Sequence, residues 1–202
     1  MASLKAELRG ETLPEFTLTL PAGWVRRAPS DQVRDEMLAA AKKRLMSVHR
    51  PDLYVQLNGM VSRMFREMNR VDTVAFFIPG PDAPDEAFLP ANLTASVRRG
   101  SHGASLDSAI AELIRNEGAT ALGEDKRILR WEQDSTETFE GVRVPTTTVA
   151  YFIPVPGTGR KRALQFTLVI TRDNDETDDG SYLEGLKMLF DAHLATFAWI
   201  PA

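Results

Sequence analysis

The side chains that could do chemistry in this chain are three histidines and a scatter of serines and carboxylates. His49 follows the first long helical pattern, His102 lies in a glycine-flanked turn, and His193 falls on the apolar side of the last helical pattern. Ser101 or Ser105 could join His102 in a triad, but the G-x-S-x-G context of a nucleophile elbow is missing. We therefore predict no catalytic residue and expect His193 to be a hydrogen-bonded core or boundary residue.

An acidic run at 173–184 has carboxylates at the first, third and twelfth positions of a calcium loop. Asp178, however, stands where an EF-hand requires glycine. Ser181 and Glu184 suit a capping box at a helix start, which explains the run without a metal. We predict no metal site and no cofactor, and calcium binding stays open as an alternative.

The segment from Gly157 to Arg162 resembles a phosphate-binding loop in composition. It joins two predicted strands, whereas a phosphate-binding loop leads into a helix, so a solvated hairpin tip is the favoured interpretation. If an acidic partner binds anywhere, we expect it at the basic residues of this tip, Arg160, Lys161 and Arg162.

Methionines recur at helical spacing as Met60, Met64 and Met68. With Met37 and Met46 they could form an adaptable apolar groove for a partner helix, because methionine fits irregular surfaces. The same stripe could simply be core. We name these three residues as partner-binding candidates.

Composition excludes several classes. The chain has 202 residues and no cysteine, which rules out disulfides and cysteine-ligated metals. Residues 1–70 carry 12 basic and 8 acidic side chains, and the remainder carries 12 and 20, a split too mild for a nucleic-acid-binding protein. The chain lacks an apolar run long enough to span a membrane, and its start lacks the pattern of a signal peptide. We expect a cytoplasmic protein.

The predicted elements must position these groups. Alternating or continuous apolar patterns predict strands at 16–20, 71–79, 93–99, 127–139, 142–153 and 163–171, mostly antiparallel in one sheet. Helical periodicity predicts a hairpin insertion at 31–70, a short helix after Ser105 and a last helix at 181–197. Residues 1–12 are expected to be a flexible leader to a single domain covering 1–202. The fold class is α+β, with about six strands flanked by helices.

The strand and turn from Phe16 to Trp24, with a P-x-G-W ending, resemble the opening of the PsbP-like superfamily. The last helix, with an aromatic residue just past its end at Trp199, is similar to the terminal helix of that superfamily. The resemblance covers both ends and the strands between 138 and 171. It implies an α/β/α sandwich of a largely non-catalytic group that includes photosystem accessory subunits, a nuclear-transport factor and chaperones for bacterial secretion effectors.

These observations predict a non-enzymatic protein-binding or chaperone-like accessory module with an unidentified protein partner. The alternative is an enzyme whose carboxylates are brought together only by the fold. Two or more strongly perturbed titratable groups in one deep pocket would favour that alternative.

Overall fold

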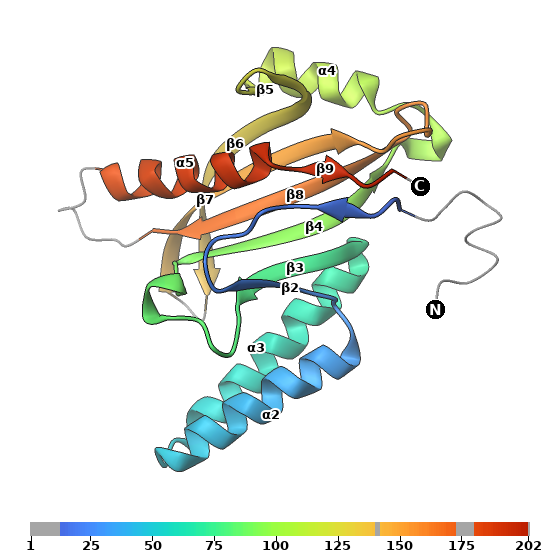
Figure 1. Cartoon of the computed structure of the whole chain (residues 1–202). Coiled ribbons are helices and arrows are strands. Elements are labelled where there is room, and N and C mark those ends of the chain that lie inside the picture. Colours follow the sequence, from blue (N-terminus) through green and yellow to red (C-terminus); the bar gives the residue numbers. More distant parts are fainter. Residues whose placement is uncertain (1–12, 140–141, 173–179, 202) are drawn as a thin grey trace.

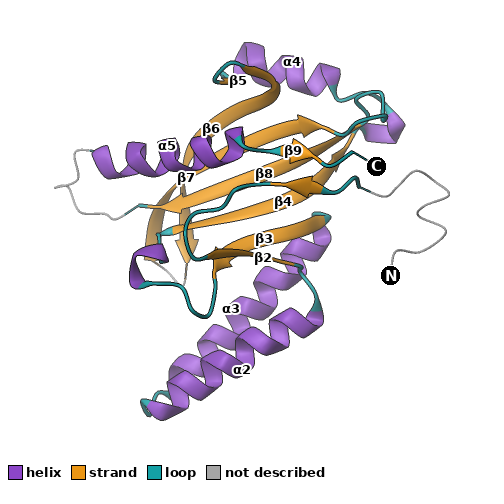
Figure 2. Cartoon of the chain, viewed as in Figure 1, coloured by secondary structure: helices purple, strands orange, loops and turns teal. Residues whose placement is uncertain are grey.

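The structure is a computed structural model that describes residues 13–139, 142–172 and 180–201. The leader predicted at 1–12 and most of the acidic run at 173–184 lie outside the described residues. Figures 1 and 2 show an antiparallel sheet with helices packed against it, so the predicted α+β class is confirmed.

The main sheet has seven strands in the order β2-β3-β4-β8-β7-β6-β5, and every neighbouring pair is antiparallel. In that order the strands are Trp24–Arg27, Thr73–Pro79, Ala91–Arg99, Arg162–Thr171, Val142–Pro154, Asp125–Phe139 and Thr120–Leu122. The strands β4, β8, β7 and β6 form the centre, and five of the six predicted strands lie in this sheet.

The prediction that residues 16–20 join the main sheet is wrong. The strand β1 (Phe16–Thr17) pairs instead with β9 (Ala198–Trp199) in a separate two-stranded sheet. The chain then turns through Gly23, whose φ of 79° is one that glycine adopts readily, and continues as β2, which pairs with β3. The strand at this edge of the main sheet is therefore β2, whose first residue, Trp24, is the last residue of the turn in the sequence pattern.

The described residues form four α-helices, which are α2 (Asp31–Ser47), α3 (Pro51–Arg70), α4 (Asp107–Asn116) and α5 (Ser181–Ala195). Two short 3-10 turns, η1 (Asp85–Ala87) and η2 (Ser101–Gly103), lie in the loops. The hydroxyl of Ser30 caps α2 by accepting from the backbone N–H of Val33 at 3.3 Å.

The predicted capping box at the start of α5 is wrong. The N-cap is Gly180, with φ 81°, and Ser181 is the first residue of the helix. Glu184 is thus the fourth helical residue, and its carboxylate accepts from Lys187 Nζ at 2.8 Å. A capping box requires serine at the N-cap itself, so the spacing is one residue out of register.

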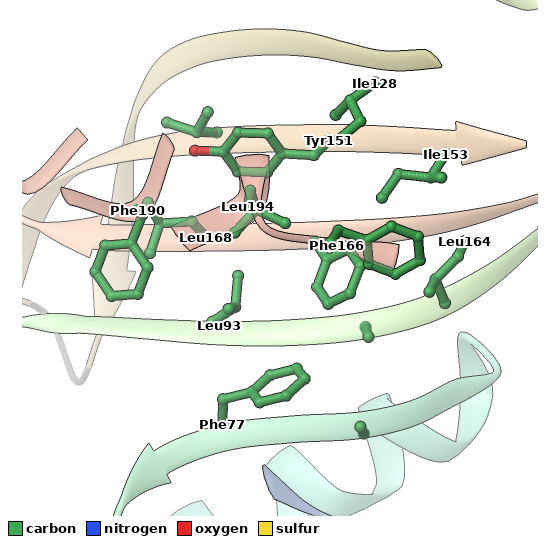
Figure 3. Close-up of a cluster of buried hydrophobic side chains, with 14 of the residues drawn as sticks. Phe77, Leu93, Ile128, Tyr151, Ile153, Leu164, Phe166, Leu168, Phe190 and Leu194 are labelled. Atoms are coloured by element: carbon green, nitrogen blue, oxygen red, sulfur yellow. The ribbon is translucent and has the colours of Figure 1, made fainter. Parts of the chain in front are cut away.

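The main core lies between α5 and one face of the sheet, as Figure 3 shows. Phe190 and Leu194 of α5 meet strand residues that include Tyr151, Phe166 and Leu168, all fully buried. The Phe166 ring also contacts three other rings, with centroids 5.7 to 6.0 Å away. The prediction that Phe166 and Leu168 are buried is confirmed.

The opposite face of the sheet carries the other helices. Because neighbouring strand residues point to opposite faces, Phe76 faces away from the core that holds Phe77. Phe76 packs instead against Phe65 and Met68 of α3. Phe152 follows Tyr151 along β7 and therefore points to the face that carries Phe76, away from the main core. Helix α4 lies near Phe152 on that face. Helices therefore flank both faces of the sheet.

Candidate functional site

The α2–α3 hairpin is fastened to the sheet near its base and extends away from it. Phe65 meets Phe76 edge to face, with ring centroids 5.6 Å apart at 80°. Met68 completes this small cluster, and Arg27 of β2 forms an ion pair with Glu36. All of α2 is described, and it contains no buried residue. Figure 1 shows the hairpin tip, at the α2–α3 turn, far from the sheet.

The predicted methionine stripe divides between core and surface. Met68 is 5% exposed, whereas Met60 and Met64 are 38% and 41% exposed. Further out, the hairpin exposes Met46, Val48 and Val55, the last at 71%. The outer hairpin, defined as residues 37–66, therefore presents several large apolar side chains to solvent.

The outer hairpin is also strongly basic. Residues 37–66 carry six basic side chains and one carboxylate, net +5, whereas the rest of the chain carries 18 basic and 27 acidic side chains, net −9. That carboxylate, Asp52, is paired with Arg50 at 2.9 Å. An anionic surface is therefore attracted to this part of an otherwise acidic protein.

The three basic residues predicted as a partner site lie in three different environments. Arg160 is exposed and forms an ion pair with Asp107 at 3.3 Å, and Lys161 is exposed beside it. Arg162 is buried as the first residue of β8, where it lies opposite Arg99 of β4 in the strand register. The structure does not bring these residues to the methionines, which lie on the hairpin.

A pocket of about 360 Å³ lies between α4 and the ends of β6, β7 and β8. Its apolar lining comes from both the helix and the sheet: Leu106, Ile110, Ile114, Leu129, Phe152, Pro154 and Ala163. Its charged lining residues are Lys126, Arg127, Arg160, Arg162 and one carboxylate, Asp107. Two of the three predicted basic residues thus contribute to this lining. Arg162 alternates with Ala163 along β8, so its side chain points toward the core face that holds Leu164.

A polar network joins α5 to the sheet on the core side. Arg130 Nε donates to both carboxylate oxygens of Asp191 at 2.9 and 3.0 Å, and Tyr151 Oη donates to the same carboxylate at 2.6 Å. Arg130 Nη2 also donates to Glu132 at 2.8 Å, and Lys187 lies 3.3 Å from Glu132. Every carboxylate in this network faces a cation.

The protonation of this network suits a structural role. Burial, reinforced by the hydrogen bond to Asp191, raises the pKa of the Tyr151 hydroxyl. Although burial alone would lower the pKa of Arg130, its hydrogen bonds to Asp191 and Glu132 hold that pKa above its ordinary value. A phenol that keeps its proton and a guanidinium that stays charged fasten a helix and do not exchange protons at neutral pH. None of the network residues lines the pocket beneath α4.

The histidines do not converge. His49 is in the α2–α3 turn, His102 is in η2, and His193 is in the last turn of α5. His49 and His102 both have positive φ, 56° and 52°, and are exposed. Within the described ranges, no group of three or more metal-ligating side chains could hold an ion. No described helix has the length and apolarity to cross a bilayer.

No protein-family model and no curated protein matches this chain. The residues and their geometry therefore carry the functional conclusion.

Two features lay beyond the sequence reasoning. The first is the pocket, whose lining combines Lys126 and Arg127 of β6 with Arg160. Basic residues beside the ends of two predicted strands were the sequence feature that could have indicated it. The network needs Arg130 and Glu132, which occupy core-facing positions of an alternating strand. Charged residues at such positions indicate a buried ion pair with a partner elsewhere in the chain.

Proposed function

We propose that this protein is a non-enzymatic binding module whose outer hairpin binds a polypeptide partner with acidic and apolar side chains. The observation that carries the proposal is the coincidence of a net charge of +5 with exposed apolar side chains on residues 37–66. The resemblance of both chain ends to the PsbP-like superfamily supports a non-catalytic role.

A polypeptide helix is the partner that this surface suits best. Met60 and Met64 lie one helical turn apart on α3, which matches the spacing of apolar residues along an amphipathic helix. Methionine side chains adapt to the shape of what they contact. Carboxylates on the partner would complement Arg63 and Arg66 of the same helix.

The test is a binding assay with the full chain and synthetic helical peptides of three kinds. The first is amphipathic with an acidic polar face, the second is amphipathic with a basic polar face, and the third is a scrambled acidic peptide. We expect the acidic amphipathic peptide to bind most tightly in fluorescence anisotropy. Added salt should weaken binding, because exposed charges are screened beyond about 10 Å at 0.1 M ionic strength.

A matched pair of variants locates the site. Met64→Glu places a carboxylate on the hairpin, and Met188→Glu places one at an exposed methionine of α5. Met64→Glu should abolish peptide binding, and Met188→Glu should leave it unchanged. Equal binding of acidic and basic peptides, or equal effects of the two variants, would overturn the proposal.

A further inference from the structure

We infer that the pocket beneath α4 binds an anionic amphiphile, a small molecule with an acidic head group and an apolar chain. This inference concerns a different surface from the outer hairpin and does not depend on the proposed function. The hairpin and the pocket share no lining residue.

The apolar part of the pocket is built across two strands and a helix. Leu129 of β6 and Phe152 of β7 are directly opposite in the register and form the floor. Ile110 and Ile114, one turn apart on α4, form the wall. This surface suits an aliphatic chain, because apolar contacts need no hydrogen-bonding partner.

The charged part lies at the end of the same strands. Pro154 pairs with Ala163 two residues beyond Phe152, and the basic residues Lys126, Arg127 and Arg160 belong to the adjoining strand ends and loop. Three cations against one carboxylate is a local excess in a chain of net charge −4. The acidic head group would lie here, with its chain along Phe152 and Leu129.

The backbone at Arg160 gives independent support. Its φ is 59°, in the left-handed region that arginine rarely adopts. Residues kept in such conformations cluster at functional sites, whereas glycine adopts this conformation without strain. The Arg160 guanidinium lies beside Asp107 at the start of α4, on the pocket lining. An arriving anion would compete with Asp107 for this arginine.

The size of the pocket favours a small molecule over a folded partner. Its volume of about 360 Å³ lies within the range of roughly 300 to 1,000 Å³ that is usual for ligand pockets. An eight-carbon carboxylate, octanoate, is therefore a suitable probe. Octan-1-ol has the same chain length without the charge, and acetate has the charge without the chain.

The experiment is isothermal titration calorimetry of the full chain with these three probes, below the concentration at which octanoate forms micelles. We expect octanoate to bind about tenfold more tightly than octan-1-ol, since the uncharged hydroxyl can accept only a weaker hydrogen bond from a guanidinium than a carboxylate accepts. Acetate should show no binding. Equal affinity for octanoate and octan-1-ol would overturn the charged half of the inference, and absence of octanoate binding would overturn the whole.

Two pairs of variants locate the site without relying on a destabilised protein. Ile114→Glu in the pocket is compared with Ile200→Glu near β9, since these isoleucines are 49% and 45% exposed. Arg160→Gly, which relieves the positive φ, is compared with Lys161→Gln, whose residue does not line the pocket. Ile114→Glu should abolish octanoate binding, and Arg160→Gly should weaken it about tenfold while the melting temperature stays equal or rises.

Unchanged octanoate affinity in both Ile114→Glu and Arg160→Gly would overturn the assignment to this pocket. If the parent protein does not bind octanoate but binds an acidic peptide, and Ile114→Glu abolishes that peptide binding, the pocket takes a polypeptide and not an amphiphile. Met64→Glu should leave octanoate binding intact, so failure of one proposal is distinguishable from failure of the other.

Discussion

Phe65→Ala is expected to detach the α2–α3 hairpin while the sheet stays folded. Phe65 is almost fully buried, yet its cluster with Met68 and Phe76 is separate from the main core on the other face of the sheet. Removing the ring takes away the edge-to-face contact between Phe65 of α3 and Phe76 of β3. The main core between α5 and the sheet loses no contact.

The size of the effect follows from the packing. Emptying a buried phenylalanine site costs about 3 to 5 kcal/mol, and the edge-to-face contact with Phe76 at 5.6 Å is part of that loss. The partly buried neighbours Val33, Met37 and Val61 can relax toward the gap, so we expect a cost near the lower limit, about 3 kcal/mol. That loss corresponds to an opening equilibrium about 100-fold more favourable.

Native-state hydrogen exchange measures this opening directly. Backbone amides of α2 and α3 should exchange about 100-fold faster in Phe65→Ala, and those of β7 and β8 should keep the rates of the parent protein. Phe166→Ala is the matched control, because its ring lies in the main core and its loss should speed exchange throughout the sheet.

Two results would refute this reasoning. Equal acceleration in hairpin and sheet would mean that the hairpin and the sheet unfold as one cooperative unit. If the exchange rates of the hairpin amides rise by an amount that corresponds to less than about 1 kcal/mol of opening free energy, Phe65 does not anchor the hairpin.

Three further predictions follow from burial and charge. Phe166→Ala should lower the free energy of unfolding by about 3 to 5 kcal/mol in denaturant melts, and a loss below about 1 kcal/mol would contradict the packing in Figure 3. Mild peroxide should oxidise Met60 and Met64 before Met68, as mass spectrometry of peptides would show, and equal rates would contradict the division of the stripe. Although burial alone would raise the pKa of Glu132, its cationic partners hold this pKa below its ordinary value. This residue's contribution to stability is therefore present above the ordinary pKa of glutamate and is lost as the pH falls through the lowered value. Urea midpoints should therefore fall on acidification less steeply in Glu132→Gln than in the parent, and identical slopes would exclude this linkage.

Much of the architecture could be predicted from local patterns. The alternation in 163–171 predicted β8, and the helical periodicity of 31–70 predicted the α2–α3 hairpin. Those signals are local, because strand alternation and helical periodicity are properties of a few neighbouring residues. The α+β class followed from them.

Strand partners could not be predicted in the same way. The segment at 16–20 has a strand pattern, but whether it pairs with the main sheet or with β9 depends on residues about 180 positions away. The placement of β2 beside β3 depends on the turn through Gly23 and on a partner across the whole hairpin. Such pairings are decided by which apolar faces meet, a property of the assembled chain.

The candidate sites divide in the same manner. The sequence by itself determined that the hairpin at 31–70 is helical and methionine-bearing and that residues 1–70 carry an excess of positive charge, since charge and periodicity are readable along one segment. Only the tertiary structure decided that Met68 is core while Met64 is exposed, because one helix face rests on Phe76 and its flank does not. Only the tertiary structure brought Arg160 of a loop, Lys126 of β6 and Ile114 of α4 around one pocket. Long-range packing places side chains that are distant in sequence within contact of one another, and no local propensity encodes that distance.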